Sequence, residues 1–181
     1  MKVIVIYGTR WGGTVSVAEK IGKVLREERY DIDVIDAKKS LLTLSSYDLF
    51  IVGSGIRADK WTRETMSFLE ENAELLRAKK TALFVSCQMA DREKEARDKA
   101  KTLYLEKVAE KYGLKPISLG FFGGFLDFHK SHGLLVDVLV RVNRNSLRKQ
   151  GLDTSKVYDT RDWSNIEVWA RQVAQSASSK Q

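Results

Sequence analysis

The sequence predicts an α/β fold in which a parallel β-sheet carries helices on both faces. Short apolar segments with the composition of strands alternate along the chain with longer segments whose apolar residues recur at helical spacing. Such alternation is typical of parallel sheets, because each connection returns across a face of the sheet as a helix. The 181 residues suit one domain, expected over residues 1–175 and followed by a polar tail at 176–181.

Five strands are expected, each short and mostly rich in Val, Ile, Leu or Phe. They span residues 2–7, 31–36, 49–53, 81–87 and 116–121. The second, DIDVID, alternates polar and apolar residues, which indicates a sheet edge with one face in solvent.

Four helices are expected, at residues 14–28, 61–77, 91–112 and 162–175. In the first, the spacing predicts a buried face made of Val15, Ala18, Ile21, Val24 and Leu25. In the last, it predicts inward positions for Ile166, Trp169, Ala170 and Val173.

The segment at residues 7–14, YGTRWGGT, joins the first strand to the first helix. Its threonines can donate hydroxyls, its glycines let the backbone approach a ligand, and the helix start exposes N–H groups, which together favour phosphate binding. The segment lacks the lysine of a nucleoside-triphosphate loop and the G-x-G-x-x-G of a dinucleotide site, so a phosphate monoester fits best. The alternative is an ordinary glycine-rich turn in which Thr14 is the N-cap.

Ligands of open parallel sheets bind beyond the carboxyl ends of the strands. In this chain the loops there are 9–14, 54–60, 86–89 and 122–125. Taken singly, each loop could serve only to connect two elements. Four loops that contain glycine or serine at the same sheet edge favour a shared pocket.

The composition gives 31 basic and 24 acidic residues, a formal net charge of +7. This surplus favours anionic partners, although a solvated basic surface accounts for most of these residues. No nucleic acid is expected as a partner, because the charge is distributed and no nucleic-acid motif is present. The single cysteine, Cys87, excludes an intramolecular disulfide and fits a reducing compartment, so a cytoplasmic location is expected.

The first of these loops resembles the phosphate loop of the flavodoxin-like FMN-binding family, T/S-x-T-G-x-T. Thr9, Gly12 and Thr14 match that pattern, and Trp11 replaces a hydroxyl residue. The resemblance implies a flavodoxin-like three-layer sandwich whose five-stranded parallel sheet has the order 2-1-3-4-5. It also implies FMN as the cofactor.

Three further stretches resemble the menaquinone-dependent protoporphyrinogen oxidase branch of that family. Residues 52–61, VGSGIRADKW, are similar to V-G-S-P-I-x-x-G-K-W, with Gly55 in place of the proline and Asp59 in place of the second glycine. Residues 123–128, GGFLDF, resemble G-G-x-L-x-Y, and residues 159–163, DTRDW, resemble the T/R-D-W that opens the last helix. Within this branch the resemblance implies porphyrinogen oxidation with a quinone acceptor.

The expected FMN site combines the phosphate loop with the walls of a pocket for a flat ring. Its residues are Thr9, Arg10, Trp11, Gly12, Gly13, Thr14, Ser54, Gly55, Ile56, Arg57, Ala58, Ser86, Cys87, Gln88, Met89, Gly123, Gly124 and Phe125. Cys87 is interpreted as a small packed hydrophobe rather than a redox thiol. Trp61 is expected to anchor a helix, whereas stacking of Trp11 on the ring stays open. The residues indicate no metal site and no catalytic acid, base or nucleophile.

An insertion at about 122–161 separates the last strand from the last helix and is longer than a simple connection. An amphipathic helix is expected over residues 133–148, although the alternation at 136–142 also permits a strand. Arg141, Arg144 and Arg148 share one face of that helix, and residues 130–149 carry a formal charge of +4, from five basic residues and one acidic. This face is a solvated surface, a wall for an anionic apolar substrate, or a peripheral contact with an acidic membrane.

The function expected from these features is that of an FMN oxidoreductase with an apolar anionic substrate and a quinone as electron partner. The alternatives are a flavodoxin-type electron carrier that serves a redox protein, and a binding domain without a redox role. The basic composition counts against the electron carrier, since carriers of this family are typically acidic. A homodimer stays open.

Overall fold

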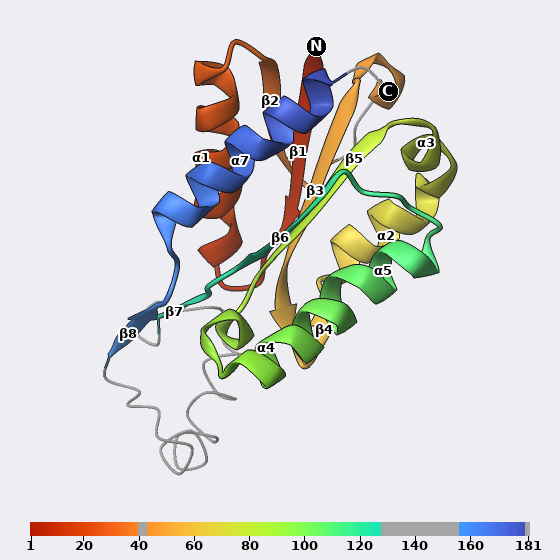
Figure 1. Cartoon of the computed structure of the whole chain (residues 1–181). Helices are drawn as coiled ribbons and strands as arrows, with labels where there is room; N and C mark the ends of the chain where they lie inside the picture. Colours follow the sequence, from red (N-terminus) through yellow and green to blue (C-terminus); the bar gives the residue numbers. More distant parts are fainter. Residues whose placement is uncertain (40–42, 128–155, 180–181) are drawn as a thin grey trace.

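A parallel sheet forms the middle layer of the structure (Figure 1). The computed structural model describes residues 1–39, 43–127 and 156–179. The parallel strands are β1 (Lys2–Gly8), β2 (Asp31–Asp36), β3 (Leu49–Arg57), β5 (Lys80–Ser86) and β6 (Ser118–Phe122). They lie in the order β2-β1-β3-β5-β6, which confirms the predicted 2-1-3-4-5 topology. The additional β4 (Lys60–Trp61), which the sequence did not predict, pairs antiparallel with the end of β3.

The burial of the strands follows their composition. Val3, Ile4, Val5 and Ile6 of the central strand β1 are all 0% exposed, because helices cover both faces there. The alternating sequence of β2 places that strand at the sheet edge, as predicted. In the register of the sheet, Val5 lies between Val34 of β2 and Ile51 of β3.

Helices α1 (Gly13–Glu27) and α7 (Trp163–Ser178) cover one face of the sheet (Figure 1). The other face carries α2 (Arg63–Glu71), α3 (Ala73–Ala78), α4 (Lys94–Lys101), a π-helical turn (Thr102–Glu106) and α5 (Lys107–Lys111). Short 3₁₀ turns occupy Leu44–Ser46 and Gln88–Asp91. The inward residues predicted for the last helix, from Ile166 to Val173, lie in the first of these two cores.

Several predicted helix boundaries are wrong. The helix expected at 61–77 begins only at Arg63, because Trp61 belongs to β4, and it is interrupted at Asn72. The helix expected at 91–112 begins at Lys94, after the 3₁₀ turn. In α1, Val17 is fully buried, whereas Val15 is only half-buried.

The polar tail expected at 176–181 is also partly wrong, because α7 continues to Ser178. Ala177 is buried, and the Nζ atom of Lys80 donates to its carbonyl oxygen at 2.6 Å. This lysine satisfies a carbonyl at the helix C-terminus, where a positive charge also complements the helix dipole.

A second sheet lies beyond the carboxyl ends of the parallel strands (Figure 1). It pairs β7 (Phe125–Asp127) with β8 (Val157–Asp159), and neither strand was predicted. The two strands bring together the chain on either side of residues 128–155. The helix expected at 133–148, with Arg141, Arg144 and Arg148, lies outside the described residues. No helix in the described part of the chain is long and apolar enough to span a membrane.

Candidate cofactor site

An open cleft lies at the carboxyl ends of the strands, the place where open parallel sheets bind ligands. Its lining comes from the carboxyl ends of the parallel strands and the segments that follow them: Thr9, Arg10, Trp11, Gly13, Thr14, Gly55, Ile56, Arg57, Ser86, Cys87, Gln88, Gly124, Phe125 and Leu126. All of these except Leu126 were predicted from the sequence. Leu126 was missed because it belongs to β7, a strand with no distinct signal in the sequence.

The loop before α1 has the backbone geometry of an anion site. Gly12 is the N-cap residue and adopts φ 80°, a left-handed conformation that glycine tolerates best. Its N–H donates to the Oγ1 atom of Thr9 at 2.9 Å, which closes the loop. The first N–H groups of α1 have no acceptor within the helix, so they can bind a phosphate at the cleft.

Thr14 is not the N-cap that one interpretation of the sequence expected, because it lies inside the first turn of α1. It lines the cleft although the residue is only 3% exposed. Within the described residues its hydroxyl makes no hydrogen bond, so this hydroxyl is available to a ligand. A Cβ atom at Gly55 would lie 2.9 Å from the Thr14 Oγ1 atom, so glycine at position 55 leaves room for this hydroxyl.

The wall after β5 presents a buried polar atom to the cleft. The Ser86 hydroxyl donates to the carbonyl of Gly123 at 2.7 Å, and the Cys87 N–H donates to the carbonyl of Phe122 at 3.0 Å, so this wall is held by its neighbours. The Nε2 atom of Gln88 is buried and has no hydrogen-bond partner among the described residues. A polar ligand in the cleft fits this unsatisfied donor, because buried polar groups are normally paired.

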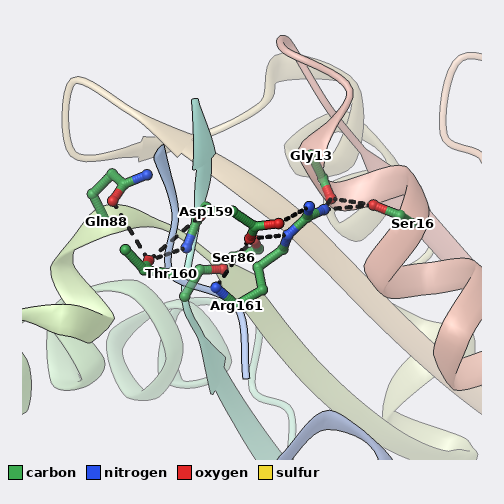
Figure 2. Close-up of polar contacts among 9 residues, drawn as sticks. Gly13, Ser16, Ser86, Gln88, Asp159, Thr160 and Arg161 are labelled. Carbon is green, nitrogen blue, oxygen red and sulfur yellow. Dashed lines mark hydrogen bonds and ion pairs between the residues drawn. The ribbon is translucent and has the colours of Figure 1, made fainter. Parts of the chain in front are cut away.

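Arg161 connects the base of the insertion to the phosphate loop (Figure 2). Its Nη1 atom donates to the carbonyl of Gly13 at 3.2 Å and to the Ser16 hydroxyl at 2.6 Å. Its Nη2 and Nε atoms bind the carboxylate of Asp159 at 2.6 and 2.7 Å. These hydrogen bonds hold the pKa of Asp159 below its usual value.

The guanidinium carbon of Arg161 also lies 4.6 Å from the ring centre of Phe125 and 4.6 Å from that of Trp163, a cation–π arrangement. The resemblance at residues 159–163 located this segment, but it carried no signal that Arg161 reaches across to α1. This contact joins Gly13 and Arg161, which are far apart in the sequence.

The glycine pair after β6 lets two segments approach closely. A Cβ atom at Gly123 would lie 1.9 Å from the carbonyl oxygen of Thr160, so a side chain cannot be accommodated there. The N–H of Gly124 donates to the Thr160 hydroxyl at 3.1 Å, and the Thr160 N–H donates to the carbonyl of Gly124 at 3.0 Å. Gly123 therefore supports the cleft wall without lining it.

Four other predicted residues, Gly12, Ser54, Ala58 and Met89, also lie beside the cleft lining rather than in it. The Ser54 hydroxyl is buried and accepts from the Thr62 N–H at 2.9 Å, which ties β3 to the start of α2. Ala58 has φ 47° and forms the turn between β3 and β4, and Met89 packs against the core.

Trp61 and Cys87 both behave as packing residues. The Trp61 Nε1 atom donates to the carbonyl of Tyr104 at 2.7 Å, and the indole is buried against the helices, as its predicted anchoring role requires. Cys87 is a buried free thiol that touches the cleft, and burial raises its pKa to about 11. The thiol is therefore neutral near pH 7, whereas nucleophilic attack would require the thiolate. The described residues contain no cluster of three or more potential metal ligands.

Comparison with known proteins agrees with this geometry. The family model for the flavodoxin domain matches residues 4–133. Over 178 residues the chain is 21% identical to the protoporphyrinogen IX dehydrogenase [quinone] of Escherichia coli K12, covering 96% of this chain and 95% of the relative.

Solved structures show the same fold. A flavodoxin of Streptococcus pneumonia TIGR4 superposes with a TM-score of 0.59 at 17% identity, covering 97% of this chain and 99% of that one. A rubredoxin oxygen:oxidoreductase of Desulfovibrio gigas matches with a TM-score of 0.52 at 14% identity over 98% of this chain, which spans only 37% of that longer protein.

Proposed function

Because the chain belongs to the flavodoxin family and FMN is therefore its cofactor, we propose that it is an FMN-dependent dehydrogenase. Its substrate is an apolar anionic molecule of the porphyrinogen class, and its electron acceptor is a quinone. When bound, FMN supplies two-electron redox chemistry. In the overall reaction, two electrons and two protons leave the porphyrinogen and reduce one quinone to a quinol.

The observation that carries the cofactor assignment is the loop from Thr9 to Thr14. It combines an open left-handed glycine, the N-terminus of a 15-residue helix and the hydroxyl of Thr14, which lines the cleft and makes no hydrogen bond within the described residues. These groups bind the phosphate of FMN in our proposal. Arg10, which lines the same cleft, adds a positive charge.

The remaining cleft residues hold and shield the ring of the cofactor. Ile56 and Arg57 lie on one wall, and Cys87 and Gln88 lie on the other. The buried Gln88 Nε2 atom is the donor in this wall that can bind a polar edge of the ring. Phe125, which Arg161 holds in place by a cation–π contact, excludes water from the third side.

The substrate and acceptor are assigned from two supporting observations. The relative from Escherichia coli is named for protoporphyrinogen IX and a quinone, and it is similar over nearly its whole length. The net charge of +7 suits a substrate that carries carboxylates.

We further propose that Arg141, Arg144 and Arg148 favour contact with an anionic membrane surface, where quinones reside. Replacing all three by Gln is expected to leave FMN affinity unchanged and to weaken sedimentation with anionic liposomes at low salt, because three attractive charges are lost. The difference should shrink near physiological salt, where charges are screened beyond about 8–10 Å. Equal sedimentation of parent and triple variant would contradict the membrane contact.

The decisive experiment begins with purification and identification of the released flavin by chromatography. The FMN-loaded protein is then assayed with protoporphyrinogen and a menaquinone analogue, with porphyrin fluorescence as the readout. We expect the FMN-loaded protein to form porphyrin only when protoporphyrinogen and the menaquinone analogue are both present. Reduction of a soluble redox protein without porphyrinogen oxidation would instead establish an electron carrier, and recovery of FAD alone would overturn the cofactor assignment.

A further inference from the structure

A second hollow adjoins the proposed FMN cleft. It is a groove of about 450 Å³ between the β3–β4 turn, the start of α2 and the π-helical turn that leads into α5. Arg10 and Arg57 line both the cleft and this groove, so a molecule in the groove lies next to the cofactor. The remaining lining residues are Asp59, Lys60, Trp61, Thr62, Arg63, Met66, Leu103, Tyr104 and Val108.

The rim of this groove is strongly basic. Arg10, Arg57, Lys60 and Arg63 are all exposed, and their side chains form no ion pair or hydrogen bond within the described part of the chain. Asp59 is the one acidic residue in the lining, and its carboxylate already accepts a hydrogen bond from the Tyr104 hydroxyl. The rim therefore presents four positive charges against one acidic residue that has a hydrogen-bond partner. Arg10 also faces the proposed phosphate site, so Arg57, Lys60 and Arg63 remain for a second ligand when FMN is bound.

The wall of the groove is apolar. Trp61 packs in the core and is held by its hydrogen bond to the carbonyl of Tyr104, while Met66 and Val108 are half-buried. Leu103 is 42% exposed and lies in the π-helical turn. Such turns are rare and often occur at functional sites. Here the turn presents Leu103 to the groove while Tyr104 and Leu105 are buried.

We propose that this groove binds the carboxylate-bearing side of the substrate, an apolar molecule with at least two carboxylates, beside the cofactor. The inference rests on the proposed function, whose porphyrinogen substrate has this chemistry. The apolar wall contacts the hydrocarbon part of the molecule, and the basic rim pairs with the carboxylates. A quinone carries no charge, so it does not account for a rim of four cations.

Lys60 and Arg63 are suitable residues for the test, because they line the groove but not the FMN cleft. The Lys60→Gln/Arg63→Gln variant is compared with Lys23→Gln/Lys94→Gln, which removes two equally exposed charges from α1 and α4. Binding of protoporphyrin, the oxidised product class, to the FMN-loaded proteins is measured by fluorescence titration. The dimethyl ester of the same porphyrin is the uncharged control probe.

We expect the groove variant to bind protoporphyrin about three- to tenfold more weakly than the parent, as the loss of two exposed charge contacts predicts. The control variant is expected to match the parent, and the ester is expected to bind all proteins equally weakly. FMN affinity and the KM for the quinone stay unchanged, whereas the KM for porphyrinogen rises by a similar factor and kcat changes little.

The outcomes separate this inference from the proposed function. Porphyrin binding that depends on Lys60 and Arg63, without turnover of porphyrinogen, would support the groove and refute the reaction. Turnover that is equal in the groove variant and the control variant would support the reaction and overturn the groove. A parent protein that binds neither the porphyrin nor its ester overturns the groove assignment as well.

Discussion

The cleft and the groove lie side by side and share Arg10 and Arg57, yet they are built from different parts of the chain. The phosphate end of the cleft is made mainly of backbone: Gly12 in a left-handed conformation, the first turn of α1 and the carbonyl of Gly13 held by Arg161. The groove is made of exposed side chains on an apolar wall. Its cations have no partners among the described residues, whereas Arg161 is bound on several sides.

This difference assigns separate tasks to the two regions. A backbone site recognises a phosphate whichever side chains surround it, so it suits a cofactor common to a whole family. A side-chain site changes with each substitution, so it suits the substrate that distinguishes one member from another. Changes in the cleft should therefore affect cofactor binding and stability, and changes in the groove should affect only substrate binding.

The largest effect is expected from Gly12→Val combined with Thr14→Ala. Valine at φ 80° strains the loop that precedes the first turn of α1, and alanine removes the hydroxyl. A hydrogen bond to a charged group is worth about 1.5–3 kcal/mol, so Thr14→Ala alone should weaken FMN binding at least about tenfold. The measurement is fluorescence titration of FMN, with circular dichroism to check the fold.

Thr14→Ser is the matched control, because it keeps the hydroxyl and should bind FMN nearly as well as the parent. If Thr14→Ala also binds with parental affinity, the phosphate lies elsewhere and the comparison of cleft and groove fails.

An intermediate effect is expected from Arg161→Gln, with Arg171→Gln as the control. The side chain of Arg161 is 8% exposed and joins Asp159 to Gly13 and Ser16, whereas that of Arg171 is 43% exposed in a surface ion-pair network. Loss of the Arg161 contacts should lower the free energy of unfolding by about 1–3 kcal/mol. Arg171→Gln should cost only about 0–1 kcal/mol.

Urea denaturation measures both changes, and FMN titration shows whether Arg161 also positions the phosphate loop. We expect weaker FMN binding only in Arg161→Gln. Equal FMN affinity in the two variants would reduce Arg161 to a purely structural contact.

The smallest effect concerns pH and Cys87, which touches the cleft. Its pKa is raised to about 11 from an ordinary value of 9.0, so between these values the unfolded chain loses the thiol proton while the folded chain keeps it. The folded state then binds more protons than the unfolded state, so stability falls as pH rises through this window. The thiol accounts for no more than about 2–3 kcal/mol of that loss.

The pKa values of Tyr7, Tyr47 and Tyr104 are also raised, so these tyrosines add to the alkaline loss in every variant. The comparison that isolates the thiol is the change in unfolding free energy from pH 8 to pH 10.5 in the parent and in Cys87→Ala. The parent should lose more. A redox thiolate, with a lowered pKa, would reverse this order.

Local patterns were sufficient to predict the parallel sheet and most of the cleft. The continuous apolar run of β1 and the alternation in β2 predicted a central and an edge strand, because burial on two faces or one leaves a direct mark on composition. The loops that contain Thr14, Gly55 and Gln88 were located because each follows a strand, and the carboxyl ends of parallel strands meet at one edge. The sequence did not predict that Trp61 belongs to β4, before the start of α2, or that the helix is interrupted at Asn72, because tertiary packing overrides local propensity at those points.

By itself, therefore, the sequence determined the order of the elements, the place of the glycine-rich loop between β1 and α1, and the family to which the chain is similar, since these depend on residues close together in the chain. Only the tertiary structure decided that Arg161 holds Gly13, that Thr14 lines the cleft beside Gly55, and that Lys60 and Arg63 border a groove next to Leu103. These arrangements join residues from separate elements. The distance between such residues is set by how helices and strands pack, which no local pattern records.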